Sequence, residues 1–133
     1  MPDTEKLNLN ILIAEDNKVN QMVARKLLEK LGCSFELAED GAKALELLES
    51  GLLKKEPFDL VLMDIMMPVM DGIEATKQIR ASNHSYSKIP VIAYTASVSG
   101  KDRETCLAAG IDEFLSKPAS AEKLAAMLTK YQS

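Results

Sequence analysis

Residues 60–72 read LVLMDIMMPVMDG, and this stretch predicts one strand–loop–helix unit. Residues 60–63 form a continuous apolar run, which is typical of a strand covered on both faces. The run ends at Asp64, and the loop that follows contains Pro68 and the turn pair Asp71-Gly72. Apolar residues at helical spacing come next. A buried strand that leads through a short loop into a covering helix is therefore expected here.

The same unit recurs along the whole chain. Four more segments are predicted to be strands, at residues 10–14, 34–38, 90–95 and 113–115. Apolar residues at helical spacing follow the five strands, within residues 19–31, 44–52, 73–79, 101–109 and 124–128. Alternation of this kind requires parallel strands with right-handed crossovers and helices on both faces. We therefore predict an α/β fold: a three-layer, flavodoxin-like sandwich with five parallel strands in the order 2-1-3-4-5.

The composition fits a single domain. The chain has 133 residues, 47% of them hydrophobic, which suffices for one domain over residues 1–133 with its core at about 8–130. Lys and Arg number 16 against 20 Asp and Glu, a net charge of −4, so direct binding to nucleic acid is not expected. No apolar stretch is long enough for a signal peptide or a membrane span. A cytoplasmic location, with no membrane attachment of its own, is predicted.

The few cysteines and histidines exclude several kinds of site. Cys33 and Cys106 have no CxxC partner, so a disulfide framework and a zinc site are not expected. His84 is the only histidine and lies in a polar stretch. We predict that both cysteines are small core residues and that His84 is solvated.

Polar side chains follow four of the predicted strands at the point where each ends. They are Glu15 and Asp16, Asp64, Thr95 and Lys117. Because ligands of open α/β sheets bind beyond the carboxyl ends of the strands, these side chains are expected to converge. Clustered carboxylates repel one another unless a cation lies among them, and oxygen ligands with a phosphate suit Mg²⁺. A lysine and a hydroxyl hold phosphoryl oxygens, and an aspartate can itself accept the phosphoryl group.

With these motifs the chain resembles the response-regulator receiver domains of two-component signalling. The resemblance covers about residues 8–130 and rests on four segments in order: ILIAEDN at 11–17, DLVLMDIMMPVMDG at 59–72, PVIAYTA at 90–96 and FLSKP at 114–118. The segment EDNKVNQ at 15–21 is similar to the receivers of hybrid histidine kinases and phosphorelays. The resemblance implies a partner that carries phosphohistidine, either a sensor histidine kinase or a histidine phosphotransfer domain. It also implies a homodimer face formed by helix 4, strand 5 and helix 5.

The resemblance implies a role for each site residue. Asp64 would accept the phosphoryl group, and the chain would catalyse only its own phosphorylation and dephosphorylation. Asp16, Asp64 and the backbone carbonyl of Met66 would ligate Mg²⁺, or Mn²⁺ in its place, and Glu15 would hold the ion through water.

Four residues beyond the acidic cluster also match family positions. Lys117 and Thr95 would bind the phosphoryl group, and Thr95 and Phe114 would form the switch. Phe114 has no hydroxyl, so no hydrogen bond holds its ring outward. Pro118 matches a proline that is commonly cis in the family.

Several polar residues have an ordinary structural interpretation. Asn17 is expected to cap a helix, and Asp40 and Asp71 are expected to serve turns, not a ligand. Residues 50–56 make the second helical region longer than is usual for the family, at a place away from the acidic rim.

Two other functions of this fold fit the sequence less well. A Mg²⁺-dependent phosphatase for an external substrate usually needs a general acid near its nucleophile and a cap, whereas residue 66 is Met and no cap-sized insertion is present. A nucleotide- or flavin-binding module would need a Gly-rich loop after the first strand, where this chain has Asn17-Lys18-Val19.

Overall fold

The computed structural model describes residues 9–65, 67, 69–95, 100–117 and 120–131. Within these ranges, five strands alternate with five α-helices and one short 3-10 helix. The strands are β1 (Asn10–Ala14), β2 (Ser34–Ala38), β3 (Leu60–Met63), β4 (Val91–Thr95) and β5 (Glu113–Ser116). The helices are α1 (Lys18–Lys30), α2 (Gly41–Leu53), α3 (Gly72–Ala81), η1 (Ser85–Lys88), α4 (Gly100–Ala109) and α5 (Ala121–Thr129).

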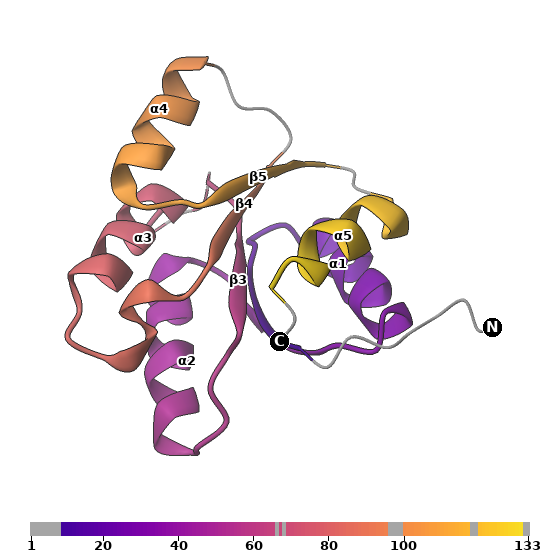
Figure 1. The fold of residues 1–133 in the computed structure, drawn as a ribbon, viewed down its shortest axis with the longest axis horizontal. Helices are drawn as coiled ribbons and strands as arrows, with labels where there is room; N and C mark the ends of the chain where they lie inside the picture. Colours follow the sequence, from indigo (N-terminus) through magenta and orange to yellow (C-terminus); the bar gives the residue numbers. More distant parts are fainter. Residues whose placement is uncertain (1–8, 66, 68, 96–99, 118–119, 132–133) are drawn as a thin grey trace.

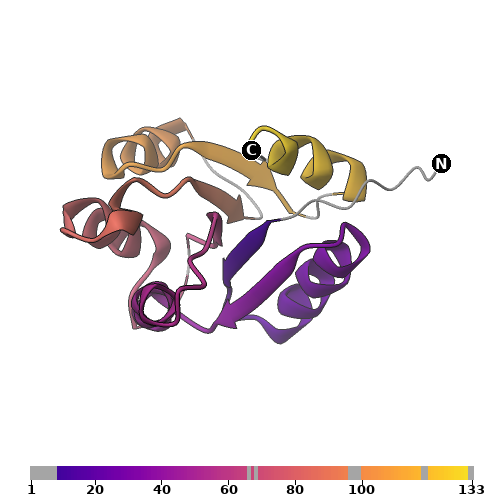
Figure 2. The same ribbon diagram turned by 60° about the horizontal axis from the view of Figure 1, so that its bottom comes forward.

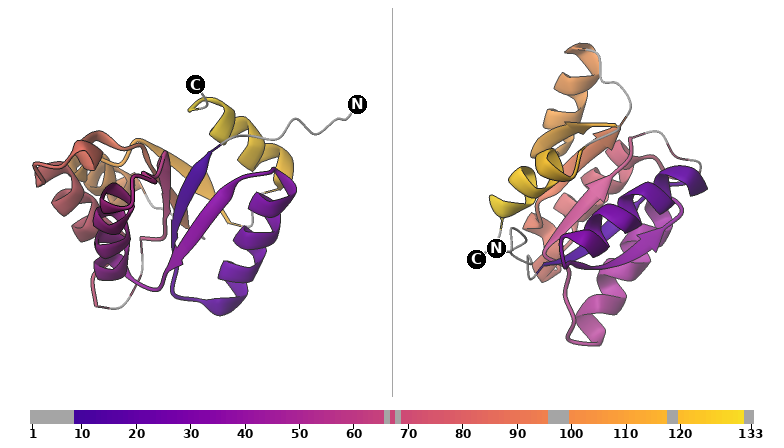
Figure 3. Two further views of the ribbon diagram at one scale, coloured as in Figure 1. Left: turned by 90° about the horizontal axis from the view of Figure 1, so that it is seen from below. Right: turned by 90° about the vertical axis from the view of Figure 1, so that its right-hand side faces the viewer.

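All strand pairs are parallel, and the order across the sheet is β2-β1-β3-β4-β5. The predicted fold and strand order are therefore confirmed. Helices α2, α3 and α4 cover one face of the sheet, and α1 and α5 cover the other (Figure 1). The three layers are seen again when the molecule is turned (Figures 2 and 3).

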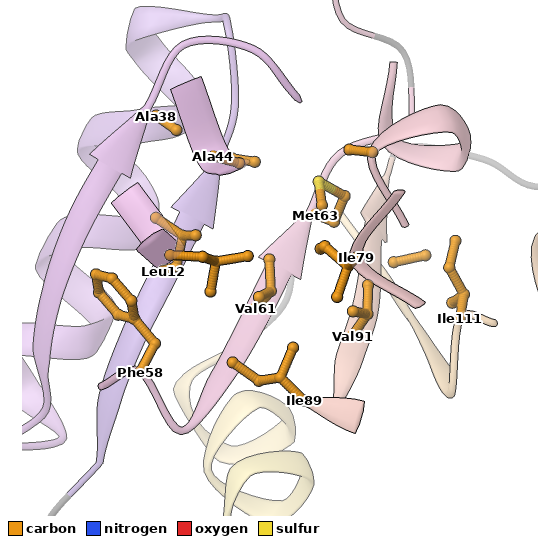
Figure 4. Packing of buried hydrophobic residues seen from close by; sticks show 14 of the residues in the cluster. Leu12, Ala38, Ala44, Phe58, Val61, Met63, Ile79, Ile89, Val91 and Ile111 are labelled. Atoms are coloured by element: carbon orange, nitrogen blue, oxygen red, sulfur yellow. The ribbon is translucent and has the colours of Figure 1, made fainter. Parts of the chain in front are cut away.

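Each face of the sheet has its own hydrophobic core. Alternate residues of β1 divide between them: Leu12 belongs to the core under α2, α3 and α4, whereas Ile11 and Ile13 belong to the core under α1 and α5. Figure 4 shows the first core, with Val61 of β3 and Val91 of β4 beside Ile79 of α3. A strand with both faces buried has no polar side, which explains why β3 is apolar throughout and why β1 and β4 carry their polar residues Asn10 and Thr95 only at a strand end.

The helices begin and end at recognisable capping residues. Asn17, Asp40 and Asp71 each accept a hydrogen bond from the backbone three residues on and cap α1, α2 and α3. The predicted cap at Asn17 is confirmed, and the residues expected to form turns are also N-caps. Gly32, with φ of 78°, follows the end of α1.

Residues 50–56 form the last turn of α2 and its cap. Lys55 adopts a φ of 61°, the amide of Glu56 donates to the carbonyl of Gly51 at 2.8 Å, and Asn10 donates to the carbonyl of Pro57 at 3.1 Å. Because Asn10 begins β1, this extension lies at the amino end of the strands, away from the acidic rim as predicted. Nothing in the sequence pattern indicated η1, which lies in the polar stretch before β4.

The two cysteines and the histidine lie where the sequence predicted. Cys33 and Cys106 are buried and unpaired with each other. His84 is exposed and stacks on Tyr86 with ring centroids 4.9 Å apart. None of the helices in the described ranges is both long and apolar enough to cross a membrane.

A cluster at the end of the chain ties α5 to the sheet. The Glu113 carboxylate accepts a hydrogen bond from the Tyr131 hydroxyl and a second, at 2.9 Å, from the Lys130 ammonium. These two hydrogen bonds hold the pKa of Glu113 below its ordinary value of 4.5. Burial of the ring, together with the hydrogen bond to Glu113, raises the pKa of Tyr131.

We predict that Glu113→Gln lowers the free energy of unfolding by about 1 kcal/mol at neutral pH, because a charge-assisted hydrogen bond is weakened. A carboxylate with a depressed pKa stabilises the folded state above its unfolded pKa, and this stabilisation is lost as the pH falls through the folded pKa. The difference between parent and variant should therefore shrink below pH 4.5, the ordinary glutamate value. Urea unfolding across this range measures it, with Glu36→Gln on the exposed side of β2 as control. A constant difference at all pH values would contradict the assignment.

Candidate functional site

The sheet's hydrogen bonds continue one residue past three strands and so align the rim residues. The amide of Glu15 donates to the Ala38 carbonyl, and the amide of Asp64 donates to the Ala14 carbonyl, both at 2.9 Å. The amide of Lys117 donates to the Thr95 carbonyl at 2.9 Å. Backbone pairing thus brings residues from four strands to one edge, as predicted from their positions in the sequence.

Three carboxylates meet at this edge. One oxygen from each of Glu15, Asp16 and Asp64 lies within 4.8 Å of the others. Glu15 is 2% exposed and Asp64 is 8% exposed, whereas Asp16 faces solvent. The cluster therefore has two buried walls and one open side.

Lys117 neutralises part of this charge. Its ammonium is hydrogen-bonded to Glu15 and lies 3.1 Å from Asp64 Oδ2, with its side chain 10% exposed. A second donor to Glu15 is the amide of Asn17, 3.0 Å from Oε2. The ammonium is thus placed between the two buried carboxylates.

Burial and charge perturb both partners of the Lys117–Glu15 pair. Desolvation raises the pKa of Glu15 above its ordinary value, and the negative charge of Asp64 adds to this. Burial alone would lower the pKa of Lys117, but the hydrogen bond and charge of Glu15 and the charge of Asp64 outweigh it and raise the pKa. The raised pKa keeps Lys117 charged beside the two carboxylates, whereas the raised pKa of Glu15 is due mainly to its burial.

The donor set fits a hard divalent cation. Three carboxylates face one ammonium, which leaves an excess of two negative charges in a partly buried space. Mg²⁺ takes oxygen ligands, retains waters and accepts a phosphate oxygen, and the exposed Asp16 leaves the cluster open on the side from which these must come.

The predicted switch residues lie on neighbouring strands. Thr95 ends β4 with 5% of its surface exposed, and Phe114 of β5 is in register with Ala93, two residues before Thr95. The Phe114 ring is half-buried, and the Arg103 guanidinium of α4 lies over it, 4.3 Å from the ring centroid. No hydroxyl holds this ring, as expected, but a cation–π contact that the sequence did not indicate does.

Two predicted site residues, Met66 and Pro118, lie outside the described residues. Asp71 caps α3 through its hydrogen bond with the Glu74 amide, at 2.8 Å, in agreement with a structural role. The remaining predicted site residues are brought together at the rim or, for Phe114, on the strand next to Thr95.

Gly72 is a site residue whose importance was missed. A Cβ at this position would lie 2.3 Å from the Asp64 carbonyl oxygen and 2.8 Å from Met63 Cγ. Only glycine lets the start of α3 approach the backbone of Asp64 so closely. The Asp71-Gly72 pair signalled a turn, and the close approach depends on packing that the sequence does not reveal.

Comparisons with known proteins agree with these features. The sequence profile described as the response regulator receiver domain matches residues 11–129. The chain is 43% identical over 126 residues to Histidine protein kinase 1 of Candida albicans, in a match that covers 92% of this chain and 5% of that protein. The chain thus spans a small part of this relative's length.

Two solved structures show the same likeness. The receiver domain of the sensor histidine kinase PA1611 from Pseudomonas aeruginosa, with a magnesium ion in its active-site cleft, is 37% identical with a TM-score of 0.78. That match covers 93% of this chain and 97% of the other. The Saccharomyces cerevisiae co-crystal structure of the histidine phosphotransfer protein Ypd1 and the receiver domain of Ssk1 gives 31% identity and a TM-score of 0.79, over 97% and 92% of the two chains.

The chain belongs to the response regulator receiver domain family. Its place is therefore in two-component signal transduction, and the resemblance drawn from the four sequence motifs is confirmed.

We predict that Gly72→Ala destabilises the fold by about 1–3 kcal/mol, because the added methyl group has no space beside the Asp64 carbonyl. Amide NMR shifts should move at Asp64 and Ile65 in the variant. Gly32→Ala is the control: it strains a left-handed residue after α1 and should cost about 1 kcal/mol without moving these shifts. Unaltered amides at Asp64 and Ile65 in Gly72→Ala would show that this approach does not position the aspartate.

Proposed function

We propose that this domain accepts a phosphoryl group from phosphohistidine on Asp64. The observation that carries the proposal is the Lys117 ammonium, 3.1 Å from Asp64 Oδ2 and hydrogen-bonded to Glu15 within a cluster of three carboxylates. Transfer of a phosphoryl group needs a placed acceptor and stabilisation of charge on the equatorial oxygens. Asp64 supplies the acceptor, and Lys117 supplies a charged donor beside it.

The reaction exchanges one bond to phosphorus for another. A carboxylate oxygen of Asp64 forms a bond to phosphorus while the bond from phosphorus to the imidazole nitrogen breaks, and the electron pair returns to that nitrogen. Hydrolysis later transfers the phosphoryl group to water and restores the carboxylate. The domain acts on its own aspartate and not on an external substrate, which agrees with the lack of a covering insertion over the rim in the sequence.

Glu15, Asp16 and Asp64 would hold Mg²⁺, with Mn²⁺ as a substitute and the Met66 carbonyl as a further ligand. A bound divalent ion neutralises charge on the phosphoryl oxygens. The residues themselves do the positioning: the sheet holds Glu15 and Asp64, and the buried Thr95 hydroxyl lies at the end of the adjacent strand.

The partner would be a sensor histidine kinase or a histidine phosphotransfer domain. Val19, Met22 and Val23 of α1 are exposed large apolar side chains, and they begin three residues after Asp16. Apolar side chains gathered beside a reactive rim favour a protein partner over a small-molecule substrate. The chain would then serve as the receiver part of a hybrid kinase or of a phosphorelay regulator.

The phosphorylated state would be communicated through Thr95 and Phe114. Phosphorylation replaces the single negative charge of the Asp64 carboxylate by a phosphoryl group that carries about −1.5 to −2 charges, and the oxygens of this group attract the Thr95 hydroxyl. This movement frees space beside Phe114, whose contact with Arg103 is worth about 0.5–1 kcal/mol at an exposed site. Such a weak contact is readily exchanged, so the ring turns inward and the surface of α4 and β5 changes.

We predict that acetyl phosphate labels Asp64 only when Mg²⁺ is present, because the domain supplies the acceptor and the charged groups itself. Intact mass should rise by one phosphoryl group, and alkali should remove it. Asp64→Asn should take no label, whereas Asp59→Asn, at the opposite end of β3, should label like the parent. Labelling that persists in Asp64→Asn would place the acceptor on another residue.

We predict that Thr95→Ala retains most labelling of Asp64 but loses the conformational response. NMR titration with beryllofluoride should shift amides of α4 and β5 in the parent and leave them nearly unchanged in the variant. Thr129→Ala, which removes a hydroxyl bonded to the Ala125 carbonyl in α5, is the matched control. If Thr95→Ala and the parent give the same shifts around Phe114, the domain relays the phosphoryl group without this switch.

A further inference from the structure

We propose that Gln21 is a positioning residue for the metal site: its side-chain amide fixes the Glu15–Asp16 peptide and thereby aims the Asp16 carboxylate. The Nε2 atom of Gln21 donates to the Glu15 carbonyl oxygen at 2.6 Å. This inference rests on the proposed function, because it assigns a role at the same carboxylate cluster. It concerns a residue of α1 that contributes no ligand itself.

Glu15 is held at every polar atom. Its amide donates to the Ala38 carbonyl at 2.9 Å, and its carboxylate accepts hydrogen bonds from the Asn17 amide and the Lys117 ammonium. The Asp64 amide donates to the carbonyl of Ala14, the residue before Glu15. The Glu15 carbonyl lies beyond this last sheet hydrogen bond and needs another donor. Gln21 satisfies this carbonyl, whose residue is only 2% exposed.

Asp16 depends on that peptide for its direction. Its side chain is exposed, and within the described ranges no hydrogen bond or ion pair holds its carboxylate. A peptide unit is planar and rotates as one body about the bonds on either side. A hydrogen bond to the Glu15 carbonyl therefore restricts the rotation that would carry Asp16 away from Glu15 and Asp64.

Gln21 is itself well anchored. It lies in the first turn of α1, where its backbone amide donates to the Asn17 carbonyl at 2.9 Å. Asn17 in turn caps the helix, because its side chain accepts a hydrogen bond from the Asn20 backbone amide at 3.0 Å. Gln21 is half-buried, so water competes less for the hydrogen bond between its side-chain amide and the Glu15 carbonyl. Groups that orient metal ligands commonly change metal affinity by about 10–100-fold when they are removed.

We expect Gln21→Met to weaken Mg²⁺ binding by about 10-fold, the lower end of that range, since only one ligand is affected. Methionine keeps the length and helix propensity of glutamine and removes the donor. Gln78→Met is the matched control, because Gln78 lies on α3 and donates to Glu74 Oε2 at 3.3 Å, away from the rim. Isothermal titration gives the Mg²⁺ dissociation constant of the parent and both variants.

Two further measurements separate positioning from a general loss of structure. In metal-free protein, Gln21→Met should shift the carbonyl carbon of Glu15 and the amide nitrogen of Asp16, while its melting temperature stays close to that of the parent. Labelling of Asp64 by acetyl phosphate should return to the parent rate when Mg²⁺ is saturating. Gln21→Asn, which keeps the amide but is one methylene too short, should behave like Gln21→Met and gives a second test if the methionine variant folds poorly.

The possible outcomes are distinguishable. If the parent protein does not bind Mg²⁺, the proposed metal site is wrong, and the inference about Gln21 is overturned with it. Parent-like Mg²⁺ affinity in both Gln21 variants, with the parent itself binding, would overturn the role of Gln21 alone. Equal weakening in Gln78→Met would show that the loss comes from the substitution and not from this hydrogen bond.

Discussion

The ion pairs of the buried Lys117 ammonium with Glu15 and Asp64 are the interaction on which the rest of the site depends. Two carboxylates with little exposure to water would repel each other strongly if no cation lay between them. The lysine reaches them from the residue after β5, across the sheet from β1. The site is therefore also a constraint on the fold, because it requires that the carboxyl ends of three strands stay at one edge.

The sheet meets this constraint with backbone hydrogen bonds. Ladder contacts extend one residue past β1, β3 and β5, so the functional residues share the rigidity of the buried strands. Beyond that limit the rim depends on local contacts, such as Gln21 with the Glu15 carbonyl and Gly72 against the Asp64 carbonyl. The sheet fixes the backbone positions of the rim residues. The helices that begin beside the rim fix the orientation of the peptide groups there.

The surface of α4 and β5 is held more loosely than the rim. Of the α4 side chains whose burial is described, only Cys106 and Ala109 are buried. The contact between Arg103 and Phe114 is an exposed cation–π interaction, which is weak. Glu15, Asp64 and Thr95 at the rim are therefore more fully buried than Phe114 and the Arg103 side chain that covers it.

Local sequence determined the fold class, the strand order and the principal site residues. Apolar runs, helical spacing and capping residues act over a few neighbours, and a carboxylate at a strand end is visible in the sequence. The contacts of Arg103, Gln21 and Gly72 were decided by the tertiary structure alone. Each joins a helix to a strand or strand end: Gln21 donates at 2.6 Å, the Arg103 guanidinium lies 4.3 Å from the Phe114 ring centroid, and Gly72 lies where a Cβ would collide with the Asp64 carbonyl. Such distances depend on how the helices pack on the sheet. Packing sums many weak interactions between segments distant in sequence, so no local pattern contains it.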